Sequence, residues 1–314
     1  MKNNFHTFFG ASIILLAVSC QNRSPKHRDT PTSGIITIGI DETFAPIVRN
    51  EIDVFENIYQ SATIMGISCP EIKAFNLLLK DSVRMIIAAR TLKKEENDYF
   101  KSIKIFPKEV RIATDGIAFI VNTQNPDTLV TTQMIKAILT GEVKNWKELN
   151  PVSHLGPIKV IFDNPQSSTA EYAINEICGN KQLSPDLAAV NDNPAVIDYV
   201  SQTPGALGII GVSWISNRKD SLSIGFLDKI KVVAVSREEI ATEANSYQPY
   251  QAYLATGQYP YTRHIYAILA DPRVGLTAGF TSFITSDRGQ RIILKSGILP
   301  VTQPLRLIHV NNSL

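Results

Sequence analysis

The chain has 314 residues, of which 44% are hydrophobic and 19% are charged, and its formal net charge at pH 7 is +2. This composition is typical of a folded globular protein and excludes a long disordered chain. A net charge this small does not indicate a nucleic-acid-binding protein, nor one held on an anionic membrane by charge alone.

The first twenty residues have the pattern of a bacterial lipoprotein signal peptide. Lys2 precedes an apolar run from Phe8 to Val18, and the small residue Ser19 stands directly before Cys20. The run is too short to span a bilayer as a stable helix. We interpret residues 1–19 as a signal peptide, Cys20 as the lipidation site and residues 20–33 as a flexible tether. The alternative is an ordinary signal peptide with a coincidental cysteine.

This interpretation predicts a protein of the cell envelope, lipid-anchored on the periplasmic side of a bacterial membrane. About 280 residues follow the tether, a length that suits two domains better than one small core.

Beyond the tether, strand-like and helix-like segments alternate. The β-branched run Ile35 to Ile40 predicts a buried strand, and apolar residues at helical spacing predict helices from Ala45 to Tyr59 and from Pro70 to Lys80. Further strands are predicted over residues 84–89, 116–121, 158–162 and 206–210. Strands separated by helices indicate an α/β fold with mostly parallel sheets.

Hydroxyl side chains stand at three of the junctions where a predicted strand ends and a helix begins. They belong to Thr43, to Ser68 and to the run Ser167-Ser168-Thr169. A helix that starts at the carboxyl end of a strand offers unpaired N–H groups to an anion. The alternative is that each hydroxyl only caps its own helix, because Ser68 with Glu71 and Ser168 with Glu171 have capping-box spacing.

Seven segments occur in the order typical of one family. They are Thr43-Phe44-Ala45-Pro46, Ala113 to Asn122 with Asn125-Pro126, Gly141 to Trp146, Ser167-Ser168-Thr169, Pro204 to Gly208, Tyr259 to Arg263, and Gly289 to Ile293 with Gly297 to Pro300. Over nearly all of its mature length the chain resembles the phosphate-binding proteins of bacterial ABC transporters. The resemblance implies a two-lobed type II periplasmic-binding-protein fold of the α/β class, with a two-strand hinge and a ligand cleft between the lobes. Lobe one is expected over residues 34–113 plus 255–314, and lobe two over residues 114–254.

The same resemblance implies ligand contacts from both lobes. Thr43 and the backbone of Phe44 are expected to bind the ligand from lobe one, together with Ser68, whose match to the family spacing is poorer. Ser167, Ser168 and Thr169 are expected to bind it from lobe two.

Two positions depart from the family pattern. Asp163 stands where the family commonly has an arginine, and Ala89, followed by Arg90, stands where many members have an aspartate. We interpret this as an exchange, in which Arg90 supplies the cation and Asp163 accepts the proton of monohydrogen phosphate. The alternative is that Arg90 and Asp163 pair with each other across the cleft or lie at its solvated rim.

The sequence predicts a monomeric binding protein that captures inorganic phosphate for a membrane ABC permease. It predicts no enzymatic activity, cofactor, metal or nucleic-acid partner, because the five histidines are scattered and no hydrolase, zinc or P-loop motif occurs. A serine hydrolase built on Ser167 would lack a neighbouring base. The alternatives are a binder of another tetrahedral oxyanion and an anchored sensor or interaction module with the same fold.

The lobe assignment also predicts the state of the two cysteines that follow Cys20. Cys69 would begin a helix at the cleft of lobe one, whereas Cys178 would lie roughly 15 Å from the cleft in lobe two. They are therefore predicted not to form a disulfide.

Overall fold

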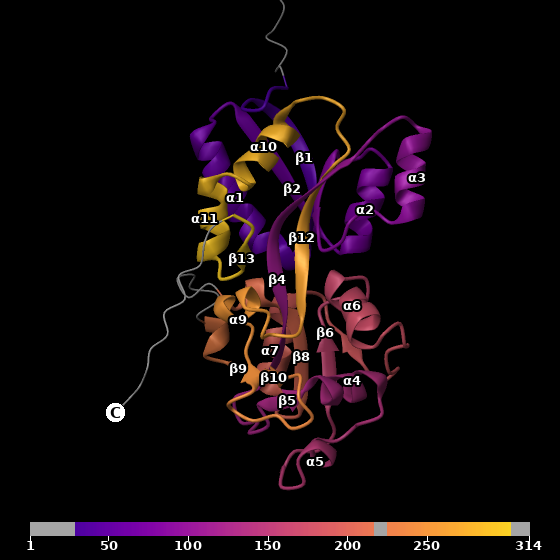
Figure 1. Cartoon of the computed structure of the whole chain (residues 1–314), viewed down its shortest axis with the longest axis vertical. Coiled ribbons are helices and arrows are strands. Elements are labelled where there is room, and N and C mark those ends of the chain that lie inside the picture. Colours follow the sequence, from indigo (N-terminus) through magenta and orange to yellow (C-terminus); the bar gives the residue numbers. More distant parts are fainter. Residues whose placement is uncertain (1–28, 217–224, 303–314) are drawn as a thin grey trace, which may run out of the picture.

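The computed structural model describes residues 29–216 and 225–302. The predicted signal peptide and the predicted lipidation site Cys20 lie outside these residues, as does the end of the chain beyond residue 302. The molecule consists of two lobes stacked along its long axis and joined by two long strands (Figure 1). Within the described ranges, no helix combines the length and the apolar character needed to cross a membrane.

Lobe one contains a parallel sheet with helices on both faces (Figure 1). Its elements are β1 (Gly34–Asp41), η2 (Glu42–Phe44), α1 (Ala45–Ile58), β2 (Ala62–Cys69), α2 (Glu71–Leu79), β3 (Met85–Ala88), α3 (Lys94–Ser102), α10 (Leu276–Ile284), α11 (Asp287–Lys295) and β13 (Leu299–Pro300). On one face of the sheet the helices α1, α10 and α11 enclose a core around Phe55 and Phe280, and on the other α2 and α3 enclose a smaller core around Phe75 and Phe100.

Lobe two has a second core centred on Trp146, Phe119 and Tyr259, all of which are fully buried. Its elements are β5 (Leu129–Thr131), α4 (Thr132–Thr140), α5 (Trp146–Leu149), β6 (Lys159–Phe162), α6 (Ser168–Tyr172), the π-helix η3 (Ala173–Ile177), β7 (Ala188–Ala189), α7 (Asn193–Gln202), β8 (Ala206–Gly211), η4 (Val212–Trp214), β9 (Ile230–Val232), β10 (Ala234–Ser236), β11 (Ser246–Tyr247) and α9 (Gln251–Ala255).

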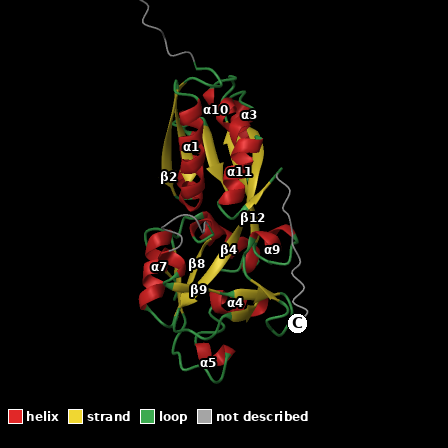
Figure 2. Ribbon diagram, turned by 90° about the vertical axis from the view of Figure 1, so that its left-hand side faces the viewer, coloured by secondary structure: helices red, strands yellow, loops and turns green. Residues whose placement is uncertain are grey.

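The hinge consists of β4 (Lys108–Asn122) and β12 (Thr262–Leu269), which run antiparallel between the lobes (Figure 2). They hold together one continuous sheet with the strand order β2-β1-β3-β12-β4-β8-β6-β7. Strand β4 pairs with β12 as far as Gly116 and with β8 from Ile117 onwards. The change of lobe therefore takes place within one strand, next to Asp115.

Most of the predicted elements are present, with small shifts at their ends. The prediction of mostly parallel sheets is only partly right, because β4 and β12 pair antiparallel with each other and with β3 and β8. Strand β2 was not predicted, because Thr63, Gly66 and Ser68 interrupt its apolar residues; it is an edge strand, and residues 65–68 are exposed.

The last part of the predicted tether is fixed to lobe one, which corrects that prediction. The Asp29 carboxylate accepts a hydrogen bond from the backbone N–H of Leu276 (2.7 Å) and pairs with Arg273 (3.2 Å). Thr30 and Ser33 form a β-bridge. The two cysteines, Cys69 and Cys178, are both free and buried, and they lie in different cores.

Candidate ligand-binding site

Thr43 lies between the end of β1 and the start of α1, at the end of lobe one that faces lobe two. Glu42, Thr43 and Phe44 form the short turn η2, and α1 follows it with a proline in its first turn. Thr43 is fully buried. Its hydroxyl oxygen is 3.4 Å from the hydroxyl oxygen of Ser168, and its carbonyl accepts a hydrogen bond from the Ser213 hydroxyl (2.7 Å). Thr43 thus contacts two elements of lobe two.

The three hydroxyls at the start of α6 have different partners. Ser167 is the N-cap: its Oγ accepts from the backbone N–H of Ala170 (3.1 Å) and donates to the Asp163 carboxylate (2.7 Å). The Ser168 hydroxyl faces lobe one. Thr169 is fully buried, and its hydroxyl has no hydrogen-bond partner in the described part of the chain. Within the described residues, Thr169 is therefore the hydroxyl of this turn that has no partner, and Ser168 is the one that faces lobe one.

The cation that meets these hydroxyls is Arg263, on the hinge strand β12. Its Nη1 donates to Ser168 Oγ (2.8 Å), while its Nε and Nη2 donate to one oxygen of Asp115 (3.2 and 3.1 Å). The guanidinium carbon lies 4.9 Å from the centre of the Phe44 ring. Arg263 is nearly fully buried. Its contacts with the Asp115 carboxylate and the Phe44 ring hold the guanidinium in one position between the lobes.

The sequence does not mark Arg263 as a site residue. Arg263 ends the segment Tyr259 to Arg263, which matches the family order, but a strand pattern cannot show which side chain points into a cleft. Pairing Arg263 with Asp115 requires the β12–β4 register, in which these two residues lie opposite each other.

Three fully buried carboxylates surround this group, and burial raises the pKa of each. Asp115 pairs with Arg263, and the pKa of Asp163 is raised to about 6. Asp41 lies beside Thr43, Ser168 and Arg263; burial raises its pKa although Arg263 opposes the effect. Asp41 Oδ1 accepts from the Thr43 N–H (3.1 Å), whereas Oδ2 has no hydrogen-bond partner within the described residues.

Asp163 has a different environment from the one predicted. Its Oδ1 accepts from the Ser167 hydroxyl and from the Asn164 N–H (2.9 Å), and its Oδ2 accepts from the Asn193 side chain (3.1 Å). Both oxygens are therefore occupied by neighbours in lobe two. The Asp163 carboxylate fixes the position of Ser167, and neither a proton from a ligand nor Arg90 is needed to satisfy it.

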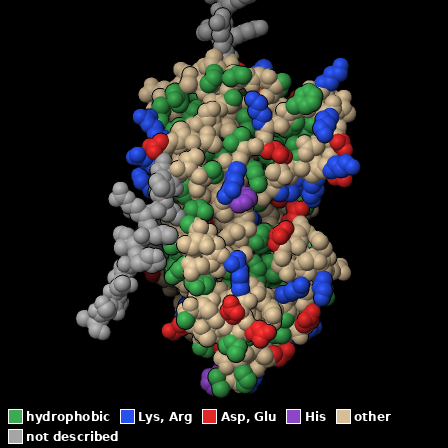
Figure 3. Space-filling model, viewed as in Figure 1, with side chains coloured by type: hydrophobic (Ala, Val, Ile, Leu, Met, Phe, Trp, Pro, Cys, Tyr) green, Lys and Arg blue, Asp and Glu red, His purple; other side chains and the backbone are tan. Residues whose placement is uncertain are grey.

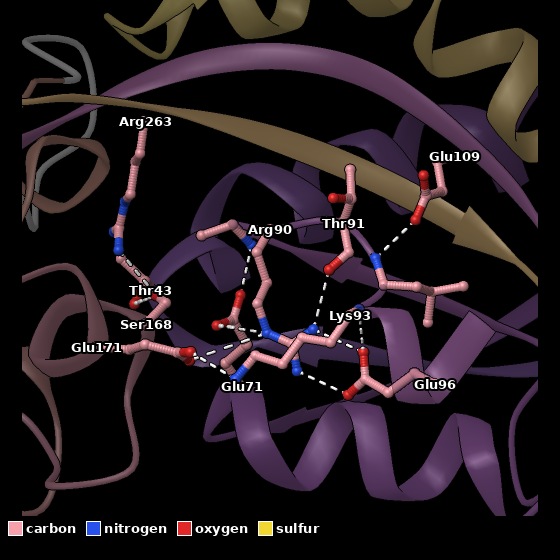
Figure 4. A network of polar contacts seen from close by, with 12 residues as sticks. Thr43, Glu71, Arg90, Thr91, Lys93, Glu96, Glu109, Ser168, Glu171 and Arg263 are labelled. Atoms are coloured by element: carbon pink, nitrogen blue, oxygen red, sulfur yellow. Dashed lines mark hydrogen bonds and ion pairs between the residues drawn. The ribbon is translucent and has the colours of Figure 1, made fainter. Parts of the chain in front are cut away.

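Arg90 also lies in an environment that the sequence did not indicate. Its guanidinium forms a bidentate pair with Glu96 (2.8 and 2.9 Å; Figure 4). The guanidinium carbon also lies 3.4 Å from the centre of the Phe75 ring. The predicted alternative, a pair between Arg90 and Asp163, is wrong, since both have other partners. Among the described residues, Nε of Arg90 has no hydrogen-bond partner, and it is 3.9 Å from carboxylate oxygens of Glu71 and Glu171.

Ser68 is exposed on the edge strand β2 and does not line the cleft cavity. The capping-box predictions are wrong at both helices. The N-cap of α2 is Pro70, without a side-chain bond, and Glu71 instead accepts from the backbone N–H of Ala89 (2.6 Å). The N-cap of α6 is Ser167 rather than Ser168.

A cavity of about 110 Å³ opens between the lobes beside this group. Its walls include Ser168 and Arg263 on one side, and Glu71, Arg90, Glu171 and Tyr172 on the other. A larger cavity of about 460 Å³ lies near Ile215, Leu227 and Leu294, but its lining is mostly apolar and does not suit an oxyanion. Within the described ranges, no cluster of three His, Cys, Asp or Glu side chains could hold a metal ion.

The chain is similar to known proteins over most of its length. A model of the PBP superfamily domain matches residues 25–288. The phosphate-binding protein PstS of Borreliella burgdorferi is 26% identical over 312 residues, which cover 96% of this chain and 99% of that protein. A PstS of Staphylococcus aureus is 23% identical over 289 residues, covering 90% and 83% of the two chains.

Solved structures show the same fold. A putative phosphate ABC transporter substrate-binding protein from Clostridium perfringens, solved with bound phosphate, has a TM-score of 0.72 at 24% identity and covers 86% of this chain and 100% of its own. An ABC-type phosphate transport receptor from Vibrio cholerae has a TM-score of 0.65 at 20% identity, covering 85% and 100%. The two-lobed periplasmic-binding-protein fold predicted from the sequence is thereby confirmed.

Proposed function

Because this chain belongs to the PBP superfamily, we propose that it is an extracytoplasmic substrate-binding protein that captures inorganic phosphate between its lobes and delivers it to a membrane ABC permease. Its relatives over nearly the full length are named phosphate-binding proteins. The protein then performs no covalent chemistry. In this proposal Cys20 carries the lipid anchor in the cell envelope, and the protein acts as a monomer.

The observation that carries the proposal is the buried meeting point of Thr43, Ser168 and Arg263. It brings hydroxyls from both lobes to a guanidinium on the hinge, so an anion bound there would contact all three parts of the molecule. A ligand that bridges two lobes stabilises their closed arrangement. The unpartnered hydroxyl of Thr169 supplies a further donor at the same turn.

Asp41 is placed to accept the proton of a protonated anion. With Oδ2 buried and unpartnered, an anion oxygen next to Asp41 must share a proton with it. Monohydrogen phosphate brings that proton, whereas sulfate requires Asp41 to take one from solvent. We assign to Asp41 the acceptor role that the sequence suggested for Asp163, and the preference for phosphate over sulfate follows from it.

Isothermal titration calorimetry tests the function directly. The sample is the mature chain with Cys20→Ser, titrated with phosphate, arsenate and sulfate. We expect tight binding of phosphate and arsenate, and Arg263→Lys should weaken phosphate binding at least about tenfold because lysine lacks the planar fork that bonds Asp115 and Ser168 together. Arg291→Lys, on the exposed face of α11, is the matched control.

The outcomes separate the candidate functions. Equal binding of sulfate and phosphate would indicate a general oxyanion binder. Absence of heat with all three anions would contradict the proposal and favour a sensor or interaction module that uses the same fold.

A further inference from the structure

The rims of the cleft carry opposite charges where the two lobes meet. In Figure 3 the surface is indented between the lobes, and Lys and Arg side chains above the indentation lie next to Asp and Glu side chains below it. Lys93, on lobe one, and Glu171, on lobe two, form an ion pair across this gap with Nζ and Oε1 2.9 Å apart. The other oxygen of Glu171 is 3.9 Å from Arg90 Nε.

We propose that Glu171 is a positioning residue for ligand capture: its carboxylate holds the cationic rim of lobe one, formed by Lys93 and Arg90, and thereby stabilises the closed cleft over the bound ligand. The inference rests on the proposed function for the identity of the ligand, and on the observed contacts for the ion pair itself.

The local structure fixes both sides of this contact. Glu171 lies in the first turn of α6, one turn from Ser167, so its backbone moves with the hydroxyls that face the ligand. Arg90 is held by Glu96 and by the Phe75 ring. Its Nε is directed towards Glu71 and Glu171 (Figure 4). The side chain of Glu171 is 25% exposed and that of Lys93 is 55% exposed, so the pair is partly shielded from water.

The ion pair between Lys93 and Glu171 affects the affinity for the ligand through the equilibrium between the open and closed arrangements of the lobes. A ligand that contacts both lobes binds the closed form, so any contact made only in that form raises the apparent affinity. Ion pairs that are exposed to water contribute little free energy. The Lys93–Glu171 pair is partly shielded and has a second cation nearby, so we place its contribution at the upper end of the range for surface pairs. Removing the carboxylate of Glu171 is therefore expected to weaken phosphate binding about two- to fivefold.

The test is calorimetry with phosphate on the mature chain carrying Cys20→Ser, at 50 mM and 500 mM NaCl. Glu171→Gln, Lys93→Met and the double variant form a double-mutant cycle. Asp186→Asn is the matched control, because it breaks the 2.8 Å pair between Lys144 and Asp186, which lies entirely within lobe two. We expect this control to bind as the unsubstituted chain does.

Three results support the proposal together. Glu171→Gln and Lys93→Met each weaken binding at 50 mM NaCl, the double variant is no weaker than the single ones, and the difference from the unsubstituted chain shrinks at 500 mM NaCl because salt screens the pair. Unchanged affinity in both single variants at low salt would overturn the proposal. So would a loss that is as large at 500 mM as at 50 mM NaCl, since it would mean that Glu171 acts through local packing.

Small-angle X-ray scattering without added anion tests the contact of Glu171 between the lobes independently of phosphate binding. If Glu171 holds the lobes together, Glu171→Gln should increase the radius of gyration at low salt, and Asp186→Asn should not. This difference is expected even if calorimetry shows no phosphate binding. An identical radius of gyration for all three proteins, together with unchanged affinity, would contradict the assigned role.

Discussion

Thr169 provides a test in which stability and binding change in opposite directions. Its buried hydroxyl has no hydrogen-bond partner in the described chain, an arrangement that costs free energy in the folded protein. We predict that Thr169→Val raises the free energy of unfolding by about 0.5–1 kcal/mol and weakens phosphate binding about tenfold. Chemical denaturation and calorimetry on the same variant measure the two effects. Thr140→Val, on α4, is the control and should leave affinity unchanged.

Asp41 predicts a difference between phosphate and sulfate in their response to pH. Sulfate binding requires Asp41 to be protonated, and burial favours the acid form by raising the pKa of Asp41, so the affinity for sulfate should rise as pH falls. Asp41→Asn should reduce this pH dependence, and it should reduce the preference for phosphate over sulfate at least about tenfold, because the amide can donate to an unprotonated oxygen. Titrations with both anions at several pH values check this. A variant that kept the full preference would remove Asp41 from the recognition of the ligand.

Glu51, on α1, predicts a pH-dependent stability unrelated to the ligand. It is 1% exposed, neither oxygen has a hydrogen-bond partner among the described residues, and burial raises its pKa to about 9. Since its pKa is raised in the folded state, its contribution to stability is complete below pH 4.5 and is lost progressively as pH rises towards 9. Glu51→Gln should therefore be more stable than the unsubstituted chain at pH 8 by at least about 1 kcal/mol, and should show a flatter pH profile.

Urea denaturation of both proteins from pH 5 to pH 9 measures this slope. The control is Glu95→Gln, on the exposed side of α3, which should follow the unsubstituted chain. Parallel profiles for Glu51→Gln and the unsubstituted chain would show that Glu51 ionises without cost.

At the scale of elements, α10 depends on a residue far away in the sequence. Its own N-cap, Gly275, has no side chain to bond the first turn, and the carboxylate of Asp29 accepts from the Leu276 N–H instead. Asp29→Ala should lower the free energy of unfolding by about 1 kcal/mol and leave phosphate affinity unchanged, because α10 lies away from the cleft. Denaturation curves compared with those of Asp53→Ala, an exposed position on α1, measure the effect. An unchanged midpoint would mean that Asp29 does not cap α10 in solution.

The whole molecule depends on the close approach of the lobes at Gly211. A Cβ atom at this position of lobe two would overlap Cγ2 of Thr43 in lobe one and lie 3.1 Å from Nη2 of Arg263. The φ angle of Gly211 is −74°, so alanine fits the local backbone, and the severest conflict, with Thr43, lies between the lobes. Gly211→Ala should weaken phosphate binding at least about tenfold by opposing closure, with little change in the midpoint of thermal unfolding.

The control for this prediction is Gly156→Ala, because a Cβ atom there would meet nothing within 4 Å. Calorimetry and thermal unfolding of both variants provide the comparison. If Gly211→Ala bound phosphate as tightly as Gly156→Ala, the lobes would not need to approach as closely as they do in this structure.

The sequence by itself determined the α/β class, most strands and helices, and the family. These follow from local apolar periodicity and from motifs of a few consecutive residues. It also located Thr43 and the run Ser167 to Thr169 at strand–helix junctions. The tertiary structure decided which charged side chains reach them. Arg263 meets Ser168 only because β12 crosses between the lobes, whereas Arg90 and Asp163 are paired with Glu96 and Ser167 by packing within each lobe. Such contacts depend on the register of strands and on the closure of two lobes, and neither is encoded in the local sequence pattern.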